Sequence, residues 1–262
     1  MIDKNTIVWI TGASSGIGES LAYAFAERGC TLILSARNTS ALETVKRNCI
    51  TAKSIEIVPL DLSKHDLIDE IVKQTVAKVG HIDILVNNAG ISQRSLVADT
   101  SFEVDKSIIN TNLLGTIALT KALLPSMLSR QKGHFVVISS VMGKIGTPLR
   151  SAYAASKHGL HGFFDSLRAE LHKSINVTIV CPGYVRTDIS QNALTEKGLK
   201  QGTMDKATEQ GLPPQYVAAK ILKAIGHNKQ EVYIGRKEVL TIYLKRFFPS
   251  LLSIMVSKIK TV

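Results

Sequence analysis

Short runs of apolar residues alternate along the chain with longer stretches in which apolar residues recur every three or four positions. The short runs are rich in Ile, Val and Leu, which is typical of strands buried on both faces of a parallel sheet. The longer stretches have the period of helices with one apolar face. The predicted strands are 7–11, 31–35, 54–60, 82–86, 133–139, 175–181 and 230–234, and the predicted helices are 16–28, 39–50, 64–79, 101–129, 151–172 and 214–227.

This alternation predicts one α/β domain with a doubly wound, Rossmann-like fold, in which a mainly parallel sheet of seven strands has helices on both faces. A chain of 262 residues suits a single large domain, and no repeat or linker divides it. We assign residues 1–235 to this domain. Two segments depart from the alternation: 188–213 is polar and dotted with glycine, and the tail 236–262 is basic and apolar and is broken by Pro249.

The formal net charge of +11 admits nucleic acid, an anionic membrane surface or an anionic cofactor as a partner. A nucleic-acid groove needs a basic stripe with exposed aromatic residues, and the sequence shows none, so we expect no nucleic-acid partner. Part of the charge lies in the tail 236–262, beside apolar residues. This composition fits a segment that lies on anionic lipid, and it fits equally a helix that closes a pocket or packs on a second copy.

Three widely spaced cysteines indicate reduced thiols of a cytoplasmic protein rather than a disulfide framework. The N-terminus leads almost directly into the strand 7–11, which is too short to be the apolar core of a secretory signal. We therefore expect a cytoplasmic protein without a long membrane span, whose tail is a candidate for peripheral membrane contact. We expect no metal site.

The strand 7–11 leads into the sequence TGASSGIG at 11–18 and then into a helix. Glycine lets a pyrophosphate approach the backbone because it has no Cβ, and the N–H groups and dipole of a helix N-terminus favour negative charge. The spacing GxxxGxG differs from the GxGxxG of many dinucleotide-binding loops. The candidates for cofactor binding in this loop are Gly12, Ser14, Ser15, Gly16, Ile17 and Gly18.

The end of the second strand predicts which dinucleotide is bound. NAD-specific sites place an Asp or Glu there to bind the ribose 2′-OH, but the stretch 30–41 contains no acid. Arg37 stands where a cation could bind a 2′-phosphate, and Asn38 could add a hydrogen bond. These residues favour NADP(H). Asp61, followed by Leu62, comes after the third strand and could bind the adenine amino group or cap the next helix.

Tyr153 and Lys157 stand four residues apart at the start of a predicted helix, so they share one face. Hydride transfer to a carbonyl leaves an alkoxide that must be protonated, and the reverse reaction needs a base. Because a free tyrosine is a poor base at neutral pH, we expect the Lys157 ammonium to lower the pKa of Tyr153 and to hold the nicotinamide ribose. Ser140 ends the fifth strand and could hold the substrate oxygen, whereas alternation along the strand turns its rival Ser139 the other way.

Together these motifs resemble those of the short-chain dehydrogenase/reductase family over nearly the whole chain. The resemblance rests on TGASSGIG at 11–18, NNAG at 87–90, NLLG at 112–115, Ser140, YAASK at 153–157 and PGYVRT at 182–187. It implies a catalytic tetrad of Asn112, Ser140, Tyr153 and Lys157. Asn112 is expected inside the long helix, holding a water against Lys157, and Ser140 rather than Ser139 is expected to be the catalytic serine.

The resemblance implies further contacts with the cofactor and with the substrate. Around the adenosine ribose and the nicotinamide carboxamide it implies Asn88, Ala89, Gly90, Pro182, Gly183, Val185 and Thr187. The segment 188–213 occupies the family's substrate-lid position, which suits a chain that orders over a bound substrate. The candidates for substrate contact are Val141, Met142, Arg150 and Tyr184, beside Ser140, and their apolar members favour an apolar, lipid- or steroid-like substrate.

Three segments, 151–171, 182–195 and 243–252, are similar to the branch of the family called dehydrogenase/reductase member 7B. The sequence ARN after the second strand is similar to NADP-dependent steroid dehydrogenases. Family members usually assemble, and the apolar faces of the helices 101–129 and 151–172 also favour a homodimer or homotetramer.

The sequence therefore predicts an NADP(H)-dependent oxidoreductase that transfers a hydride between nicotinamide and a carbonyl or alcohol substrate, with Tyr153 as general acid/base. Two alternatives remain: a cofactor-binding sensor without turnover, and an epimerase or dehydratase that uses the same site. The intact tetrad argues against the sensor, which has no need of Tyr153 and Lys157.

Overall fold

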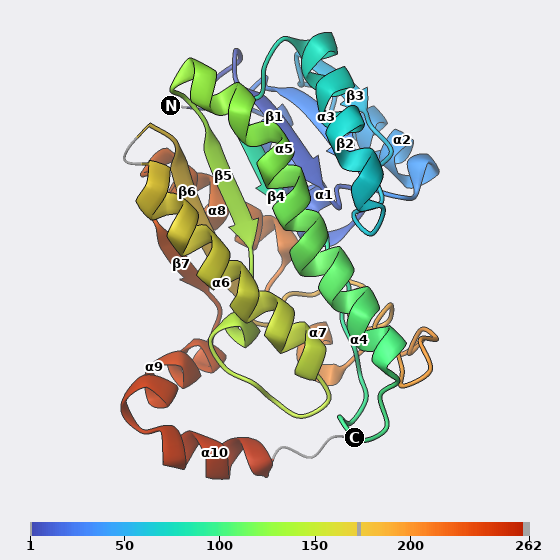
Figure 1. Cartoon of the computed structure of the whole chain (residues 1–262), viewed down its shortest axis with the longest axis vertical. Helices are drawn as coiled ribbons and strands as arrows, with labels where there is room; N and C mark the ends of the chain where they lie inside the picture. Colours follow the sequence, from blue (N-terminus) through green and yellow to red (C-terminus); the bar gives the residue numbers. More distant parts are fainter. Residues whose placement is uncertain (1, 172–173, 259–262) are drawn as a thin grey trace.

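The computed structural model describes residues 2–171 and 174–258. Within these residues, seven parallel strands form one sheet in the order β3-β2-β1-β4-β5-β6-β7 (Figure 1). The strands are β1 (Ile7–Thr11), β2 (Thr31–Ser35), β3 (Ser54–Ile57), β4 (Ile84–Asn87), β5 (His134–Ile138), β6 (Asn176–Pro182) and β7 (Glu231–Ile234). The predicted α/β class and the seven-stranded Rossmann-like sheet are confirmed.

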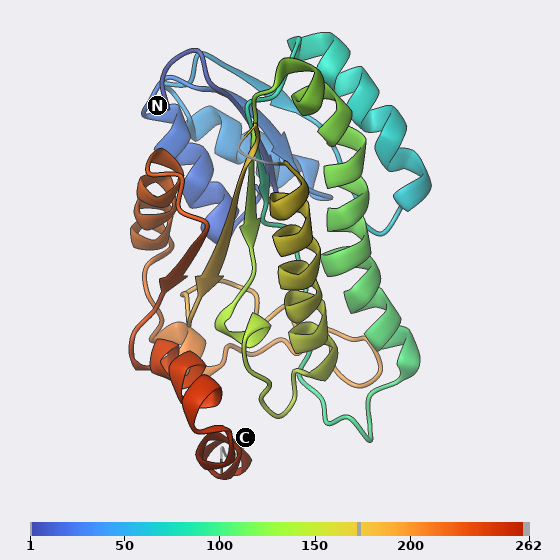
Figure 2. The same ribbon diagram turned by 60° about the vertical axis from the view of Figure 1, so that its left-hand side comes forward.

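Helices cover both faces of the sheet (Figure 2). One face packs on α1 and α8 through side chains such as Phe25 and Ile221, and the other packs on α3, α5 and α6 through side chains such as Leu123 and Phe164. Each face therefore buries a separate apolar core, which is why the strands are apolar throughout. The helices are α1 (Gly16–Ala26), α2 (Thr39–Asn48), α3 (His65–Val79), α4 (Phe102–Ile109), α5 (Gly115–Arg130), α6 (Ser151–Leu171), α7 (Lys206–Glu209), α8 (Pro214–Gly226), α9 (Leu240–Phe247) and α10 (Pro249–Ser257).

Most predicted elements differ from the structure by one or two residues at an end, and three of the differences have a clear physical cause. The strand predicted to end at residue 60 ends at Ile57, shortly before Pro59, which has no N–H to donate to a ladder. The strand predicted from residue 82 begins at Ile84, because the Asp83 carboxylate accepts the Ile7 N–H at 3.0 Å. The predicted helix 101–129 contains a π-helical turn over Asn110–Leu114.

Among the described residues, one continuous helix, Phe102–Arg130, is long and apolar enough to cross a membrane by length and composition alone. Its residues Leu119, Leu123 and Met127 are fully buried against the sheet. One face of this helix therefore belongs to the core.

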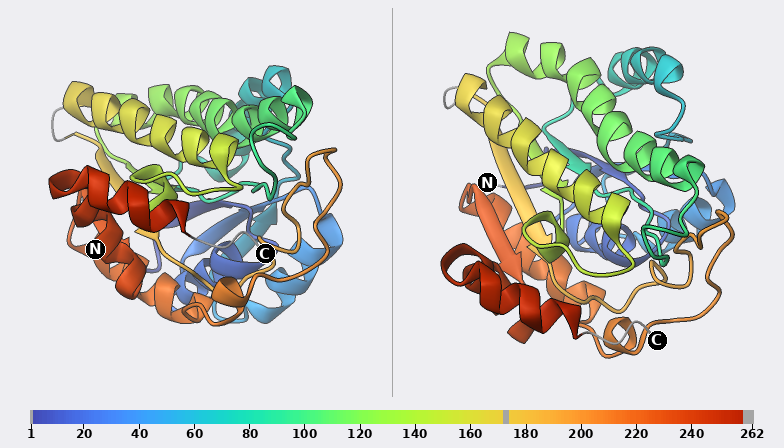
Figure 3. Two further views of the ribbon diagram at one scale, coloured as in Figure 1. Left: turned by 90° about the horizontal axis from the view of Figure 1, so that it is seen from below. Right: turned by 60° about the horizontal axis from the view of Figure 1, so that its bottom comes forward.

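The two segments outside the alternation lie at the carboxyl ends of the strands (Figure 3). Bridges between Gln93 and Leu194 and between Val185 and Leu212 fix the predicted lid 188–213 to neighbouring loops. The tail forms α9 and α10, which meet at Pro249. The predicted break at this proline is confirmed.

Candidate active site

A cavity of about 930 Å³ opens at the carboxyl ends of the strands, where ligands bind in open α/β sheets. Segments that follow β1, β2, β4, β5 and β6 all contribute to its lining. Nearly every residue that the sequence predicted for the site lines this cavity; the two exceptions are Gly18 and Asn112. The structure thus brings the glycine loop and the tyrosine motif into one space.

The three glycines of the 11–18 loop are required by close approaches of the backbone. Gly12 has a φ of 63°, and a Cβ there would lie 2.9 Å from the Ala89 Cα. Gly16 has a φ of 59°, and its Cβ would lie 2.8 Å from the Thr187 Cγ2. A Cβ at Gly18 would overlap the Gly12 carbonyl oxygen. Gly18 therefore lets the loop pack closely on itself without lining the cavity, while the N-terminus of α1 faces the cavity.

Asn88 holds the glycine loop in place. Its Nδ2 donates to the Thr11 carbonyl at 2.9 Å and to the Gly12 carbonyl at 3.2 Å. The Thr11 hydroxyl accepts the backbone N–H groups of Asn88 and Ala89 at 3.0 and 3.1 Å. Asn88 lines the cavity, while its side chain links the ends of β1 and β4.

Arg37 and Asn38 follow β2 at the rim of the cavity. Arg37 is exposed, and the Asn38 Oδ1 caps α2 by accepting the Ala41 N–H at 3.1 Å. This cap uses the amide oxygen and leaves the Asn38 Nδ2 available as a donor. The arrangement places a guanidinium and an amide at the rim of the cavity.

Asp61 lies beside Arg37 and is the anionic group at this rim. Its Oδ1 accepts the Ser63 N–H at 3.0 Å and the Ser63 hydroxyl at 2.8 Å. Partial burial raises the pKa of Asp61, but these hydrogen bonds and the charges of Arg37 and Lys64 outweigh that effect and hold the pKa below its usual range. The alternative that Asp61 caps the next helix is wrong, because α3 begins at His65 with Lys64 as its cap residue.

Tyr153 and Lys157 lie in the first two turns of α6, and both are buried. The Lys157 Nζ donates to the Ile138 carbonyl at 2.8 Å and lies 5.7 Å from the centroid of the Tyr153 ring. Burial lowers the pKa of Lys157 to about 8. The predicted common face of the two residues is confirmed.

The pKa of Tyr153 is raised, which differs from the expectation that Lys157 lowers it. Burial is the largest cause of the increase, because a phenolate loses its hydration in the protein interior. The Ser140 hydroxyl and the charges of Arg94 and Arg150 act in the opposite direction. The positive charge that favours the phenolate thus comes from two arginines.

The two serines at the end of β5 have different surroundings. The Ser140 Oγ accepts the Met142 N–H at 3.1 Å and lies near the phenol of Tyr153. The Ser139 Oγ donates to the Lys157 carbonyl at 3.2 Å and lies 3.1 Å from the His161 Nε2. Ser139 therefore anchors α6, and Ser140 is the hydroxyl beside Tyr153, as predicted.

Asn112 lies in the π-helical turn and is fully buried. Its Oδ1 accepts the Ile91 N–H at 2.8 Å, and its Nδ2 donates to the Ile91 carbonyl at 2.8 Å and to the Ser156 Oγ at 3.1 Å. Both amide hydrogens are thus used to join the loop after β4 to α6. The expected contact with a water beside Lys157 stays a prediction.

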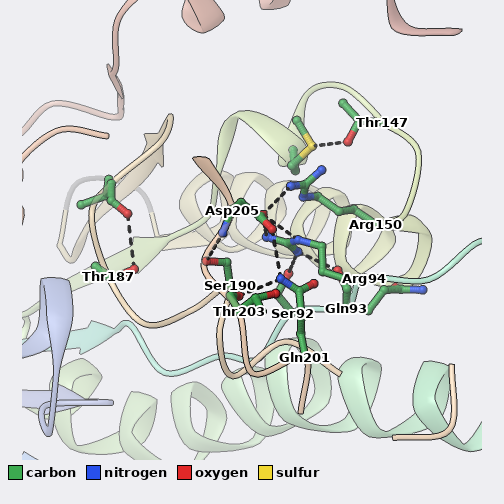
Figure 4. A network of polar contacts seen from close by, with 12 residues as sticks. Ser92, Gln93, Arg94, Thr147, Arg150, Thr187, Ser190, Gln201, Thr203 and Asp205 are labelled. Carbon is green, nitrogen blue, oxygen red and sulfur yellow. Dashed lines mark hydrogen bonds and ion pairs between the residues drawn. The ribbon is translucent and has the colours of Figure 1, made fainter. Parts of the chain in front are cut away.

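Arg150, predicted as a substrate contact, lines the cavity and belongs to a charged cluster with two residues that the sequence reasoning missed, Arg94 and Asp205. Figure 4 shows Asp205 between the two arginines. The Asp205 Oδ2 accepts from the Arg94 Nε at 2.8 Å and from an Arg150 terminal nitrogen at 3.1 Å, and its Oδ1 accepts from the Gln201 Nε2 at 3.1 Å. Two guanidinium groups face one carboxylate, so the cluster carries one excess positive charge near Tyr153.

Gln93 was also missed, although it fixes the position of the tyrosine. Its side chain is fully buried, and its Oε1 accepts the N–H groups of Ala152 and Tyr153 at 2.9 and 3.3 Å. These N–H groups belong to the first turn of α6 and lack partners within the helix. No local signal could have revealed Gln93 or the cluster, since their partners lie 59 and 111 residues away along the chain.

Comparison with known proteins defines the class of this molecule. The short chain dehydrogenase family matches residues 6–198 of the chain. The chain therefore belongs to the short-chain dehydrogenase family of nucleotide-binding oxidoreductases.

Two of its relatives belong to the predicted branch. Dehydrogenase/reductase SDR family protein 7-like of Drosophila melanogaster is 45% identical over 252 residues, which are 94% of this chain and 77% of that protein. Dehydrogenase/reductase SDR family member 7B of Bos taurus is 44% identical over 257 residues, covering 95% of this chain and 79% of that protein. The resemblance stated from the motifs is confirmed.

Solved structures support the same fold at lower identity. A short-chain dehydrogenase/reductase from Burkholderia phymatum in complex with NAD is 22% identical, with a TM-score of 0.85 and 95% of both chains covered. An alcohol dehydrogenase from Thermococcus sibiricus complexed with 5-hydroxy-NADP is 24% identical, with a TM-score of 0.76, and covers 89% of this chain and 97% of that one.

Proposed function

We propose that this protein is an NADP(H)-dependent oxidoreductase that interconverts a carbonyl and an alcohol, with Tyr153 as the general acid/base. The observation that carries the proposal is the placement of Tyr153, Lys157 and Ser140 in the same cavity as the glycine loop and Arg37. A glycine loop at a helix N-terminus fits a pyrophosphate, and a buried phenol fits proton transfer to a substrate oxygen.

Each residue has a distinct task in this proposal. The nicotinamide, when bound, supplies or accepts the hydride. In the reductive direction Ser140 donates a hydrogen bond to the substrate carbonyl oxygen, and the Tyr153 hydroxyl gives that oxygen its proton. Lys157 holds the ribose. Gln93 accepts the backbone N–H groups of Ala152 and Tyr153, and Asn112 donates to the Ser156 hydroxyl in the next turn of α6. In the oxidative direction the Tyr153 phenolate takes the proton from the alcohol.

The preference for NADP(H) over NAD(H) rests on Arg37 and on the absence of an acid between residues 30 and 41. A guanidinium binds a 2′-phosphate by charge-assisted hydrogen bonds, which contribute about 2 kcal/mol or about thirtyfold in affinity. Calorimetric titration of wild type and Arg37→Ala with NADPH and NADH tests this. We expect the substitution to weaken NADPH selectively.

Arg47→Ala is the matched control, because Arg47 is an exposed arginine of α2 that does not line the cavity. It should leave both affinities unchanged. Tighter binding of NADH by the wild type, or equal losses in the two arginine variants, would refute the assignment of NADP(H).

The substrate that this cavity favours has an apolar body beside its carbonyl group. Val141, Met142 and Val256 line the cavity and belong to an apolar cluster with side chains of α9 and α10. A turnover panel that pairs NADPH with apolar and with small charged carbonyl compounds tests this. Turnover of the small charged compounds alone would contradict it.

We further propose that the protein forms a homodimer or homotetramer through the outer faces of α5 and α6. Ile117 of α5 is half-buried, and Leu114 and Leu128, just before and within α5, are exposed apolar side chains. Sedimentation velocity tests this, and a monomer at micromolar concentration would contradict it.

A further inference from the structure

The C-terminal helices α9 and α10 bury one face and leave the other in solvent. On the inner side, Ile242 and Leu252 pack on Val141 and Ile145, beside the cavity. On the outer side, large apolar side chains keep half or more of their surface exposed: Leu240, Tyr243, Phe247, Phe248, Leu251, Ile254 and Met255. A soluble monomer rarely exposes so many in one short segment, so this outer face indicates a partner.

The exposed charges of the same segment are all positive. Lys245, Arg246 and Lys258 are exposed on α9 and after α10, and residues 239–258 contain no acid. The preceding Glu238 is turned toward the protein, where its Oε1 accepts the backbone N–H groups of Tyr184 and Arg236 at 3.2 and 3.1 Å. The outer face is therefore apolar and cationic without a compensating anion.

We propose that the outer face of α9 and α10 docks on the surface of an anionic lipid bilayer. Amphipathic helices of this kind lie in the interface, with apolar side chains among the acyl chains and Lys and Arg at the phosphates. A second copy of the chain fits less well, because a twofold contact between two such faces would bring like charges together. The favoured occupant is thus a membrane rather than another protomer.

The docking face and the cavity share the same helices. Thr241 of α9 and Val256 of α10 line the cavity, and both helices lie at the end of the molecule where the strands end (Figure 3). Docking would therefore bring the cavity close to the bilayer, from which an apolar substrate could be delivered. Only this delivery rests on the proposed function; the docking itself does not.

Flotation with lipid vesicles tests the proposal without any substrate. The full chain is mixed with vesicles of phosphatidylcholine alone, or of two parts phosphatidylcholine to one part phosphatidylserine. We expect it to float with the anionic vesicles and to remain behind with the neutral ones. The double variant Lys245→Glu/Arg246→Glu should lower the partition coefficient by about tenfold or more. The matched control Lys220→Glu/Lys223→Glu on α8 should keep the wild-type value.

A second set of variants tests the apolar side chains. Phe247→Ser/Ile254→Ser/Met255→Ser should lose flotation, while Ile50→Ser/Leu67→Ser/Tyr216→Ser, at exposed positions elsewhere, should not. Circular dichroism and calorimetric binding of NADPH show that each variant is folded. Equal flotation with neutral vesicles, no flotation with anionic ones, or equal losses in the variants and controls would overturn the proposal. So would a dimer that dissociates in the tail variants without any lipid binding.

Discussion

The two ends of the cavity are built in different ways. The glycine loop of the cofactor end consists of backbone and a helix N-terminus, and its three glycines at close backbone approaches lie within residues 11–18. The substrate end consists of side chains, and its charged cluster joins Arg94, Arg150 and Asp205 from three distant segments. The first end depends on conformations that only glycine allows, whereas the second depends on pairs of side chains that other pairs could replace. This difference predicts that damage at one end should leave the other intact.

The largest effect is expected at Gly18. A Cβ at this position would overlap the Gly12 carbonyl oxygen, so Gly18→Ala should distort the loop and weaken NADPH binding by about a hundredfold or more. Calorimetric titration measures the loss.

Gly162→Ala is the matched control, because nothing lies within 4 Å of a Cβ at this exposed position of α6. It should bind NADPH as the wild type does and should gain up to about 1 kcal/mol in the free energy of unfolding. If Gly18→Ala bound NADPH normally, the backbone account of the cofactor end would be wrong.

The second effect concerns Asp205. Its replacement by Asn leaves two guanidinium groups without their carboxylate and frees the lid segment that carries residue 205. Because the three side chains are partly exposed, we expect the transition state to lose about 2 kcal/mol of stabilisation. This loss corresponds to a fall of about thirtyfold in kcat/KM, and the affinity for NADPH should not change. Steady-state kinetics and calorimetry separate the two quantities.

Asp165→Asn provides the comparison for that substitution. Asp165 pairs with Arg168 on the exposed side of α6, and such pairs contribute little. The variant should retain kcat/KM. A fall in NADPH affinity in Asp205→Asn would show that the two ends are coupled.

The contrast between the two ends also explains what the sequence could predict. Local motifs contain Gly12, Arg37, Tyr153 and Lys157. Because a parallel sheet places the carboxyl ends of its strands at one edge, the fold alone predicts that these residues lie in one cavity. The Arg94–Asp205 pair joins residues 111 positions apart, and no spacing within a motif encodes it.

The direction of the Tyr153 pKa could not be predicted for a related reason. Burial is the largest cause of the raised Tyr153 pKa, and the charges that act against it belong to Arg94 and Arg150. Tertiary contacts bring these two arginines close to the tyrosine. The π-helical turn at Asn112 is likewise a consequence of packing, since it places the amide on the Ile91 backbone. Periodicity alone predicts an uninterrupted helix.

A third effect lies outside both ends and sets a baseline for pH experiments. Burial lowers the pKa of His134 to about 4, against about 6.5 in the unfolded chain. The unfolded state therefore binds more protons than the folded state between these two pH values. The contribution of His134 to the free energy of unfolding is fully present above about pH 6.5 and is lost as the pH falls toward 4. From pH 7.5 to pH 5 this residue alone should lower the free energy of unfolding by about 2 kcal/mol.

Urea unfolding followed by circular dichroism at the two pH values measures this loss. In the variant His134→Gln the difference should shrink, because glutamine does not titrate and can still bond the Thr178 hydroxyl, which lies 2.8 Å from His134. An unchanged difference in the variant would assign the effect to other groups.

The smallest effect is expected at Arg150. Its charge lowers the pKa of Tyr153, so Arg150→Met should raise that pKa. In the reductive direction the tyrosine must be protonated, and the alkaline limb of the kcat/KM profile should therefore move to higher pH, by less than about one unit. Arg168→Met, which removes a cation far from the tyrosine, should leave the limb in place. A shift to lower pH would contradict the electrostatic role of Arg150.

The most direct test of the account follows a deuterium atom. NADPH that carries two deuterium atoms at C4 of the nicotinamide is incubated with the protein and an apolar ketone, and the alcohol is analysed by mass spectrometry. The account predicts that the wild type forms an alcohol with one deuterium on the former carbonyl carbon. In Tyr153→Phe the rate of formation of this alcohol should fall by about a thousandfold or more, while the variant still binds NADPH. An alcohol without deuterium, or undiminished transfer in Tyr153→Phe, would contradict it.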